Sequence, residues 1–334
     1  MRTSPCFFRT RSDGQYAATF EITYSCNLKC QHCMSNTNIN SFLGMNYEKI
    51  CKLFDELKEI GTGSIYITGG EPLLYYAIDQ VLEYAFKLGF EVRLASNGIE
   101  VPKHIEAIKK YVCEVSLSLD AIGNRYDEIR GNPNLFENLD NAISLLQSNN
   151  IPCVISTVVS AANCFDIESV VKYVKMRGLN QLSISVMVPI DENSRGISVS
   201  DYYSVVEAIK SIKKQYEDDT FSILDRRMNP VDRSSSKCYG GEKIVHIDPK
   251  GIVYPCSWCG KVDALSSYSM KWEPGNLLSC VEKIRSIQEV VELHLKKYSY
   301  PGCPAMAALK ESDHQICNDP INQLLLTQNI IQPQ

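Results

Sequence analysis

The sequence predicts an α/β protein in which repeated strand–helix units are followed by a smaller, cysteine-rich unit. Six short segments rich in β-branched or aromatic residues alternate with six amphipathic helical patterns in the first two thirds of the chain. This alternation stops after about residue 218, and six of the 14 cysteines follow it. With 44% hydrophobic residues among 334, the composition supplies ample apolar material for a core.

The first predicted strand covers residues 18–24, and the helix predicted at 47–60 places Ile50, Leu53 and Phe54 on one face. Because strands joined through helices pair in parallel by right-handed crossovers, six such units form either an open doubly wound sheet or a partial barrel. In both folds, functional groups gather at the carboxyl ends of the strands. The other strands are predicted at 64–68, 91–95, 114–119, 153–159 and 181–188, and the other helices at 78–88, 104–111, 135–147, 167–177 and 200–216.

A polar segment separates this region from the second unit. Residues 225–237 contain Pro230 and three consecutive serines, which is typical of a linker. Two short strands at 243–248 and 252–255 then flank a hairpin turn, and helices are predicted at 278–295 and 305–310. We therefore divide the chain into an extension (1–17), a strand–helix domain (18–217), a linker (218–237) and a C-terminal domain (238–334).

Charge and hydropathy exclude several classes of partner. The net charge is −5 and no basic block is present, so we expect no nucleic-acid partner. No segment has the roughly 18 uncharged apolar residues that a membrane span needs. Residues 1–15 lack the apolar core of a signal peptide, which predicts a cytoplasmic location. Cysteines in that compartment favour metal binding or thiol chemistry over disulfides.

Cys26, Cys30 and Cys33 form a C-x3-C-x2-C triplet directly after the first predicted strand. Three thiolates can hold a four-iron cube and leave one iron open to another ligand, whereas a structural zinc site needs four protein ligands. His32 is a possible fourth zinc ligand, although it lies between two of the cysteines.

In this position the triplet resembles the signature of the radical S-adenosylmethionine (SAM) enzymes. The resemblance implies an α/β fold with a partial (β/α)6 barrel of the TIM type. It implies a [4Fe–4S] cluster held by Cys26, Cys30 and Cys33, with SAM bound to the open iron. In that family, reductive cleavage of SAM yields a 5′-deoxyadenosyl radical that abstracts hydrogen from the substrate.

Further segments resemble the SAM site of that family. Gly69 and Gly70 would let the backbone approach the ligand, and Glu71 would help hold the SAM amino group. Arg130 resembles a residue that pairs with the SAM carboxylate, and Met187 would pack on adenine. A solvated charge at Arg130, a core methionine and ordinary loop caps are the alternatives. Four residues resemble segments that line the ribose and methionine parts of SAM: Ser96, Asn97, Ser118 and Asp120.

The spacing Cys238-x12-Gly251-x4-Cys256 resembles the opening of a SPASM or twitch extension, which implies a small C-terminal iron–sulfur domain with auxiliary clusters. Cys303 resembles a later ligand, but residues 293–302 contain no cysteine, so one auxiliary [4Fe–4S] cluster is predicted. Its ligands would be Cys238, Cys256 and Cys303, with Cys259 as the fourth. The alternative is a zinc ribbon, because Cys256 and Cys259 also have zinc-like spacing.

The resemblance implies modification of a ribosomally made peptide by cross-linking, dehydrogenation or epimerisation. For epimerisation, Cys317 is the candidate hydrogen donor, because a helix N-terminus is expected to lower the pKa of Cys280. An external reductase, flavodoxin or ferredoxin would supply electrons, and a separate protein would assist peptide recognition. The alternatives are oxidation of a small molecule, such as a tetrapyrrole or amino-cyclitol, and a non-enzymatic zinc-stabilised binding module.

Overall fold

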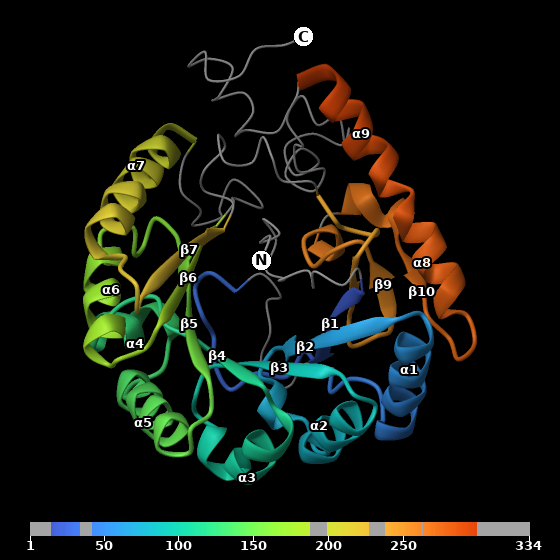
Figure 1. The fold of residues 1–334 in the computed structure, drawn as a ribbon, viewed down its shortest axis with the longest axis horizontal. Coiled ribbons are helices and arrows are strands. Elements are labelled where there is room, and N and C mark those ends of the chain that lie inside the picture. Colours follow the sequence, from blue (N-terminus) through green and yellow to red (C-terminus); the bar gives the residue numbers. More distant parts are fainter. Residues whose placement is uncertain (1–14, 34–41, 188–198, 227–237, 262, 299–334) are drawn as a thin grey trace. The chain divides into compact units, whose positions relative to one another are not determined.

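The computed structural model describes residues 15–33, 42–187, 199–226, 238–261 and 263–298 (Figure 1). The chain forms two compact units. One contains residues 1–20, 45–65 and 229–334, and the other contains residues 21–44 and 66–228. Within the described ranges, no helix is long and apolar enough to cross a membrane.

The second unit is a series of parallel strands. Strands β1 and β2 begin in the first unit and end in this one, and the order continues from β2 through β3, β4, β5, β6 and β7. Register partners such as Leu94 and Val115, or Ile155 and Leu182, show the parallel pairing. The predicted α/β class is confirmed. The strands are β1 Tyr16–Thr23, β2 Thr62–Gly69, β3 Glu91–Ser96, β4 Glu114–Ser118, β5 Cys153–Val159, β6 Gln181–Val186 and β7 Ser222–Arg226.

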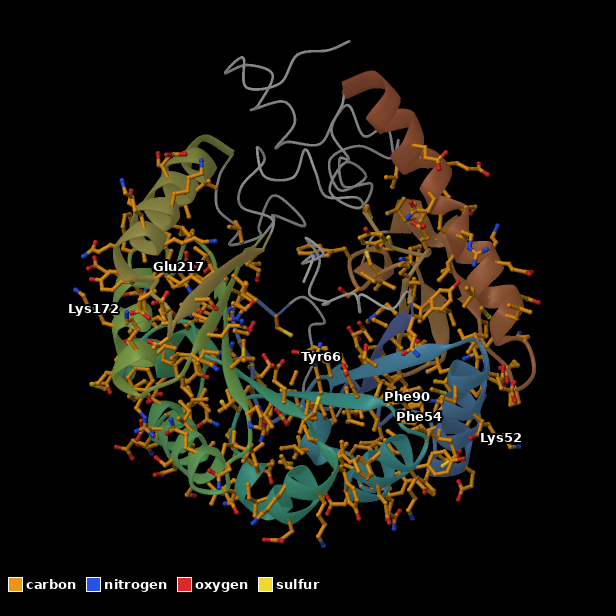
Figure 2. The ribbon with its side chains drawn as sticks, viewed as in Figure 1. Lys52, Phe54, Tyr66, Phe90, Lys172 and Glu217 are labelled. Carbon is orange, nitrogen blue, oxygen red and sulfur yellow. The ribbon has the colours of Figure 1, made fainter. Side chains whose placement is uncertain are left out.

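Helices cover the outer side of strands β3 to β7 in this unit (Figure 1). Leu94, Leu117 and Ile155, which lie in these strands, are fully buried. Lys172 on α6 points away from the strands (Figure 2). The helices are η1 Pro72–Leu74, α2 Ile78–Lys87, α3 Val101–Tyr111, α4 Asn124–Arg130, α5 Leu135–Ser148, α6 Ile167–Met176 and α7 Val199–Tyr216.

The prediction that residues 218–237 form a linker is wrong in part, because strand β7 lies inside this range. It pairs in parallel with β6, and Leu182 is the register partner of Ile223. Ile223 is fully buried and Phe221 is nearly so. This strand is too short, and too close to polar residues, to stand out in the sequence. Its burial against β6 is a tertiary effect that propensity does not reveal.

The first unit contains the predicted hairpin. Strand β8 pairs in parallel with β1 and antiparallel with β9. Asp248 fixes the turn, because its Oδ1 accepts hydrogen bonds from the Lys250 and Ile252 amides, and Gly251 adopts a φ of +80°. The remaining elements of this unit are α1 Tyr47–Glu59, β8 Ile244–Ile247, β9 Ile252–Tyr254, η3 Cys259–Lys261, η4 Asp263–Tyr268, β10 Met270–Lys271, α8 Leu277–Arg285 and α9 Ile287–Tyr298.

The helix predicted at 278–295 is divided in two. Helix α8 ends at Arg285 and α9 begins at Ile287. Between them, the Ser286 hydroxyl donates to the Lys283 carbonyl at 2.8 Å. Serine side chains compete for backbone groups in this way, which explains a break that the apolar pattern conceals. The helix predicted at 305–310 lies outside the described residues.

Candidate functional site

The three cysteines of the triplet lie in the loop that follows β1. Helix α4 holds this loop, because the Gln31 amide donates to the Ile129 carbonyl at 3.1 Å and the Gln31 side chain donates to the Glu128 carbonyl at 3.3 Å. Gly131, which ends α4 with a φ of +70°, lies against the Lys29 carbonyl. The cysteine loop is therefore seated on the C-terminal end of α4.

The donor set of this loop fits an iron–sulfur cluster, since Cys26, Cys30 and Cys33 are all free thiols. Burial raises the pKa of Cys26 to about 11 and also raises that of Cys30, where the Arg130 charge partly opposes it. Among the residues with described positions, no three His, Cys, Asp or Glu side chains are grouped tightly enough for one metal ion. A four-iron cube spaces its thiolates more widely than a single ion does.

Asp120, in the loop after β4, binds His32 of the cysteine loop and Arg130 of α4. Its Oδ2 accepts from Arg130 Nε at 2.8 Å and Nη2 at 2.6 Å, and lies 3.2 Å from His32 Nε2. Its Oδ1 accepts from the Val158 amide at 2.9 Å. Burial opposes the ionisation of Asp120, but the charges of Arg130 and His32 outweigh it and hold its pKa well below the usual range.

Arg130 is not a solvated charge, since it is only 7% exposed. Its position on α4 turns the guanidinium inward to Asp120, so that alternative from the sequence is wrong. His32, considered above as a zinc ligand, directs its Nε2 to the same carboxylate. Sequence spacing gave no signal for this pairing, because the two residues are brought together only when the cysteine loop packs on α4.

Glu71 is 1% exposed, and its carboxylate is bonded within the protein. Oε1 accepts from the Leu73 amide at 3.2 Å and the Ser96 hydroxyl at 3.0 Å, while Oε2 accepts from the Asn97 amide at 2.8 Å. Burial raises its pKa to about 7 despite these bonds. The structure thus brings Glu71, Ser96 and Asn97 together. The Glu71 carboxylate fixes the backbone at the end of β3 through these hydrogen bonds.

The two glycines before Glu71 pack closely against the backbone at the end of β1. The Gly70 amide donates to the Thr23 carbonyl at 2.7 Å, and the Glu71 amide donates to the Ser25 carbonyl at 2.8 Å. A Cβ on Gly70 would collide with the Ser25 carbonyl oxygen. Only glycine permits this close approach, which sets the ends of β1 and β2 against each other.

The remaining predicted SAM residues lie at neighbouring strand ends. Ser118 ends β4, where its carbonyl accepts from the Tyr126 hydroxyl. Met187 follows β6 and is buried. Two contributors had no signal in the sequence. Asn27 accepts from Asn97 Nδ2 at 2.8 Å, and Asn163 Nδ2 donates to the Asp120 carbonyl at 2.9 Å.

The second cysteine set lies in the first unit. The sulfurs of Cys256 and Cys259 are 3.6 Å apart. Gln288 holds the segment at Cys238, because its Nε2 donates to the Cys238 carbonyl at 3.1 Å and the Gly240 carbonyl at 2.6 Å. Cys303 and Cys317 lie outside the described residues.

Cys280 differs from the sequence-based expectation. It is fully buried on α8, and its sulfur donates to Asn276 Oδ1 at 3.4 Å. Burial, together with the nearby Glu56 charge, raises its pKa to about 11. The expected lowering by the helix N-terminus is wrong, because loss of water around a buried thiolate outweighs the amides.

Proteins similar to this chain include a bacteriocin biosynthesis protein and a heme synthase. The antilisterial bacteriocin subtilosin biosynthesis protein AlbA of Bacillus subtilis strain 168 is 27% identical over 246 residues, covering 72% of this chain and 54% of that protein. The AdoMet-dependent heme synthase of Nitratidesulfovibrio vulgaris Hildenborough is 25% identical over 288 residues, covering 76% and 78%. The chain thus spans about half the length of AlbA.

A solved structure and a family model agree on the fold. Native anSMEcpe with bound AdoMet and Cp18Cys peptide matches with a TM-score of 0.69 at 17% identity, over 94% of this chain and 99% of that one. The likeness identifies the partial barrel expected above. Residues 20–174, from β1 to α6, match the model of the radical SAM superfamily. Over this region, the chain is similar to the radical SAM superfamily.

Proposed function

We propose that this protein is a radical SAM enzyme that modifies a ribosomally made peptide. The observation that carries the proposal is the cysteine loop seated on α4 and held at Asp120 by His32 and Arg130. A [4Fe–4S] cluster and SAM bound there would supply a 5′-deoxyadenosyl radical for hydrogen abstraction. Cys26, Cys30 and Cys33 would be the protein ligands of the cluster.

The chain's own residues would hold and orient these groups. Glu71 acts as a positioning residue, because its bonds to Ser96 and Asn97 fix the loops at the ends of β2 and β3. Asn97 then reaches Asn27 in the cysteine loop. Arg130 remains a candidate for the SAM carboxylate, with Asp120 holding it in place. The residues proposed to line the SAM site are Gly69, Gly70, Ser96, Asn97, Ser118, Asp120 and Met187.

A peptide substrate is supported by two comparisons. AlbA is named for biosynthesis of a bacteriocin, and the anSMEcpe structure has AdoMet and a peptide bound. The product would be a cross-linked, dehydrogenated or epimerised peptide. A redox partner of the reductase, flavodoxin or ferredoxin type would supply the electron, and a separate recognition protein remains part of the proposal, as does a cytoplasmic location.

We also propose one auxiliary [4Fe–4S] cluster in the domain that begins at Cys238. The closeness of the Cys256 and Cys259 sulfurs supports them as ligands together with Cys238, and Cys303 completes the proposed set. The buried, hydrogen-bonded Cys280 is poorly placed to meet a substrate. Cys317 therefore stays the proposed hydrogen donor if the reaction is an epimerisation.

Small-molecule oxidation is the second candidate. The heme synthase match favours it, because this chain covers 78% of that protein compared with 54% of AlbA. A tetrapyrrole or amino-cyclitol substrate would use the same SAM site. A peptide encoded beside the gene, tested for a mass change with the active enzyme, distinguishes the two candidates.

The test of the proposed function is anaerobic reconstitution. We expect about eight irons per chain and reductive cleavage of SAM to 5′-deoxyadenosine. Replacing Cys26, Cys30 and Cys33 together with Ala should leave roughly half of the iron and abolish SAM cleavage. A colourless protein that binds zinc would instead establish the binding-module alternative.

A further inference from the structure

Gln288 is a buried polar residue in the first turn of α9, where it is only 9% exposed. Its Nε2 donates to the Cys238 carbonyl at 3.1 Å and to the Gly240 carbonyl at 2.6 Å. These two bonds fix the orientation of the amide, because a rotated carboxamide would place Oε1 against two carbonyl oxygens. Gln288 therefore connects α9 to the turn that begins at Cys238.

The oxygen of the same carboxamide makes no comparable bond. Gln288 Oε1 is enclosed by the protein, yet none of the residues with described positions donates a hydrogen bond to it. Buried polar atoms nearly always have partners, and leaving one without a partner is unfavourable. An apolar side chain at position 288 would avoid that cost. The advantage of glutamine here therefore lies in the two bonds of Nε2, and these bonds act on the Cys238 turn.

The turn after Cys238 packs closely against two other segments of the first unit. The Gly241 amide donates to the Pro255 carbonyl at 3.1 Å, and Pro255 directly precedes Cys256. A Cβ on Gly241 would collide with the Ile284 carbonyl oxygen of α8. Gly241 has a φ of +73°, a conformation that glycine adopts without strain. The turn is thus held between Pro255 and helix α8.

The same turn brings the Cys238 thiol near the segment that carries the other proposed ligands. A Cβ added to Gly240 would lie 3.6 Å from Cys238 Sγ and 3.4 Å from the Pro255 carbonyl oxygen, so both atoms lie near one point. Cys256 follows Pro255, and its sulfur is 3.6 Å from that of Cys259. Cys238 comes from a separate segment of the chain, whereas Cys256 and Cys259 are close in sequence. Its position relative to that pair therefore depends on what holds its own turn.

We propose that Gln288 is a positioning residue for the auxiliary cluster and that it acts through Cys238. By fixing the carbonyls of Cys238 and Gly240, it holds the Cys238 thiolate in place for iron. This inference rests on the proposed function, because it assumes that Cys238, Cys256 and Cys259 bind a cluster. Groups that orient a metal ligand without touching the metal typically change metal affinity by roughly 10- to 100-fold when they are removed. Gln288 therefore sets how firmly the first unit retains its cluster.

The test compares how fast the proposed auxiliary cluster loses iron to a chelator in anaerobically reconstituted proteins. Gln288→Met keeps the length of the side chain and removes its donors. We expect the auxiliary-cluster signal in electron paramagnetic resonance to decay at least about ten-fold faster in this variant. The signal of the first cluster and its response to SAM should not change, whereas general destabilisation would affect both clusters. Glu289→Met, at the exposed next position of α9, is the matched control and should leave both decay rates unchanged.

Equal decay rates in Gln288→Met and the unmodified protein, or equal acceleration for both clusters, would overturn the proposal. A second measurement does not depend on that variant and uses the protein in which Cys26, Cys30 and Cys33 are replaced with Ala. With isotope-labelled glutamine, nuclear magnetic resonance should show one carboxamide that exchanges its protons slowly and shifts when the auxiliary cluster is removed. The lack of any such carboxamide would also overturn the proposal. If the unmodified protein holds only about four irons, the auxiliary cluster of the proposed function is refuted instead, so the two failures are distinguishable.

Discussion

Glu71 shows how one buried carboxylate can organise two loops. Three donors from the ends of β2 and β3 converge on it, yet burial raises its pKa to about 7. A motif match identifies such a residue as important. The match does not reveal that the Glu71 carboxylate oxygens accept hydrogen bonds from the protein itself, because these bonds depend on how β2 and β3 pack.

The raised pKa of Glu71 has a consequence for stability. Since the folded pKa exceeds the usual value of 4.5, this group contributes stability below about pH 4.5, and that contribution is lost as pH rises toward about 7. We expect unfolding free energy to fall over this range in the unmodified protein and to fall less in Glu71→Gln. Chemical denaturation at several pH values measures this. Parallel curves for the two proteins would contradict the assignment.

Asp120 is the second residue on which the site depends. Asp120→Asn would leave the Arg130 guanidinium buried without its counter-charge, a change that costs about 3 to 5 kcal/mol for buried pairs. We expect that loss in urea unfolding, together with reduced iron in the reconstituted protein. The control is Glu83→Gln, which removes the exposed pair with Lys87 and should have no resolvable effect. Normal stability of Asp120→Asn would refute this role.

Helices and strands with a local sequence signal were predicted, whereas those that depend on tertiary packing were missed. Strong apolar periodicity predicted α1, and the Asp248–Gly251 turn predicted the β8–β9 hairpin, since both signals are local. Strand β7 and the break at Ser286 were missed, because a five-residue strand and a serine contact to one carbonyl leave little trace in the pattern.

Helices α1 and α8 are joined by one side chain. Glu56 on α1 accepts from Trp272 Nε1 at 3.2 Å, the Gly275 amide at 2.7 Å and the Leu277 amide at 3.0 Å. Glu56→Ala would leave these donors without their partner. We expect a loss of about 1 to 3 kcal/mol in urea unfolding. Glu59→Ala, on the exposed face of the same helix, is the control, and equal losses in both variants would exclude this role for Glu56.

At the scale of the whole molecule, each compact unit contains one of the two cysteine sets. Both sets stay predictions made from the spacing of cysteines, which is a local property of the sequence. The supports were not predicted. His32, Asn27 and Asn163 act through partners distant in sequence.

The cysteine pair in the first unit gives the sharpest test of which cysteines bind the proposed auxiliary cluster. Cys256 and Cys259 have sulfurs 3.6 Å apart, whereas Cys280 is buried and bonded to Asn276 and Lys271. We expect Cys259→Ala to lose auxiliary-cluster iron and its electron paramagnetic resonance signal while SAM still perturbs the signal of the first cluster. Cys280→Ala should keep both signals, because its thiol is already satisfied within the protein. If Cys259→Ala kept its full iron content and Cys280→Ala lost iron, the cluster ligand would be Cys280 on α8 and not Cys259 in η3.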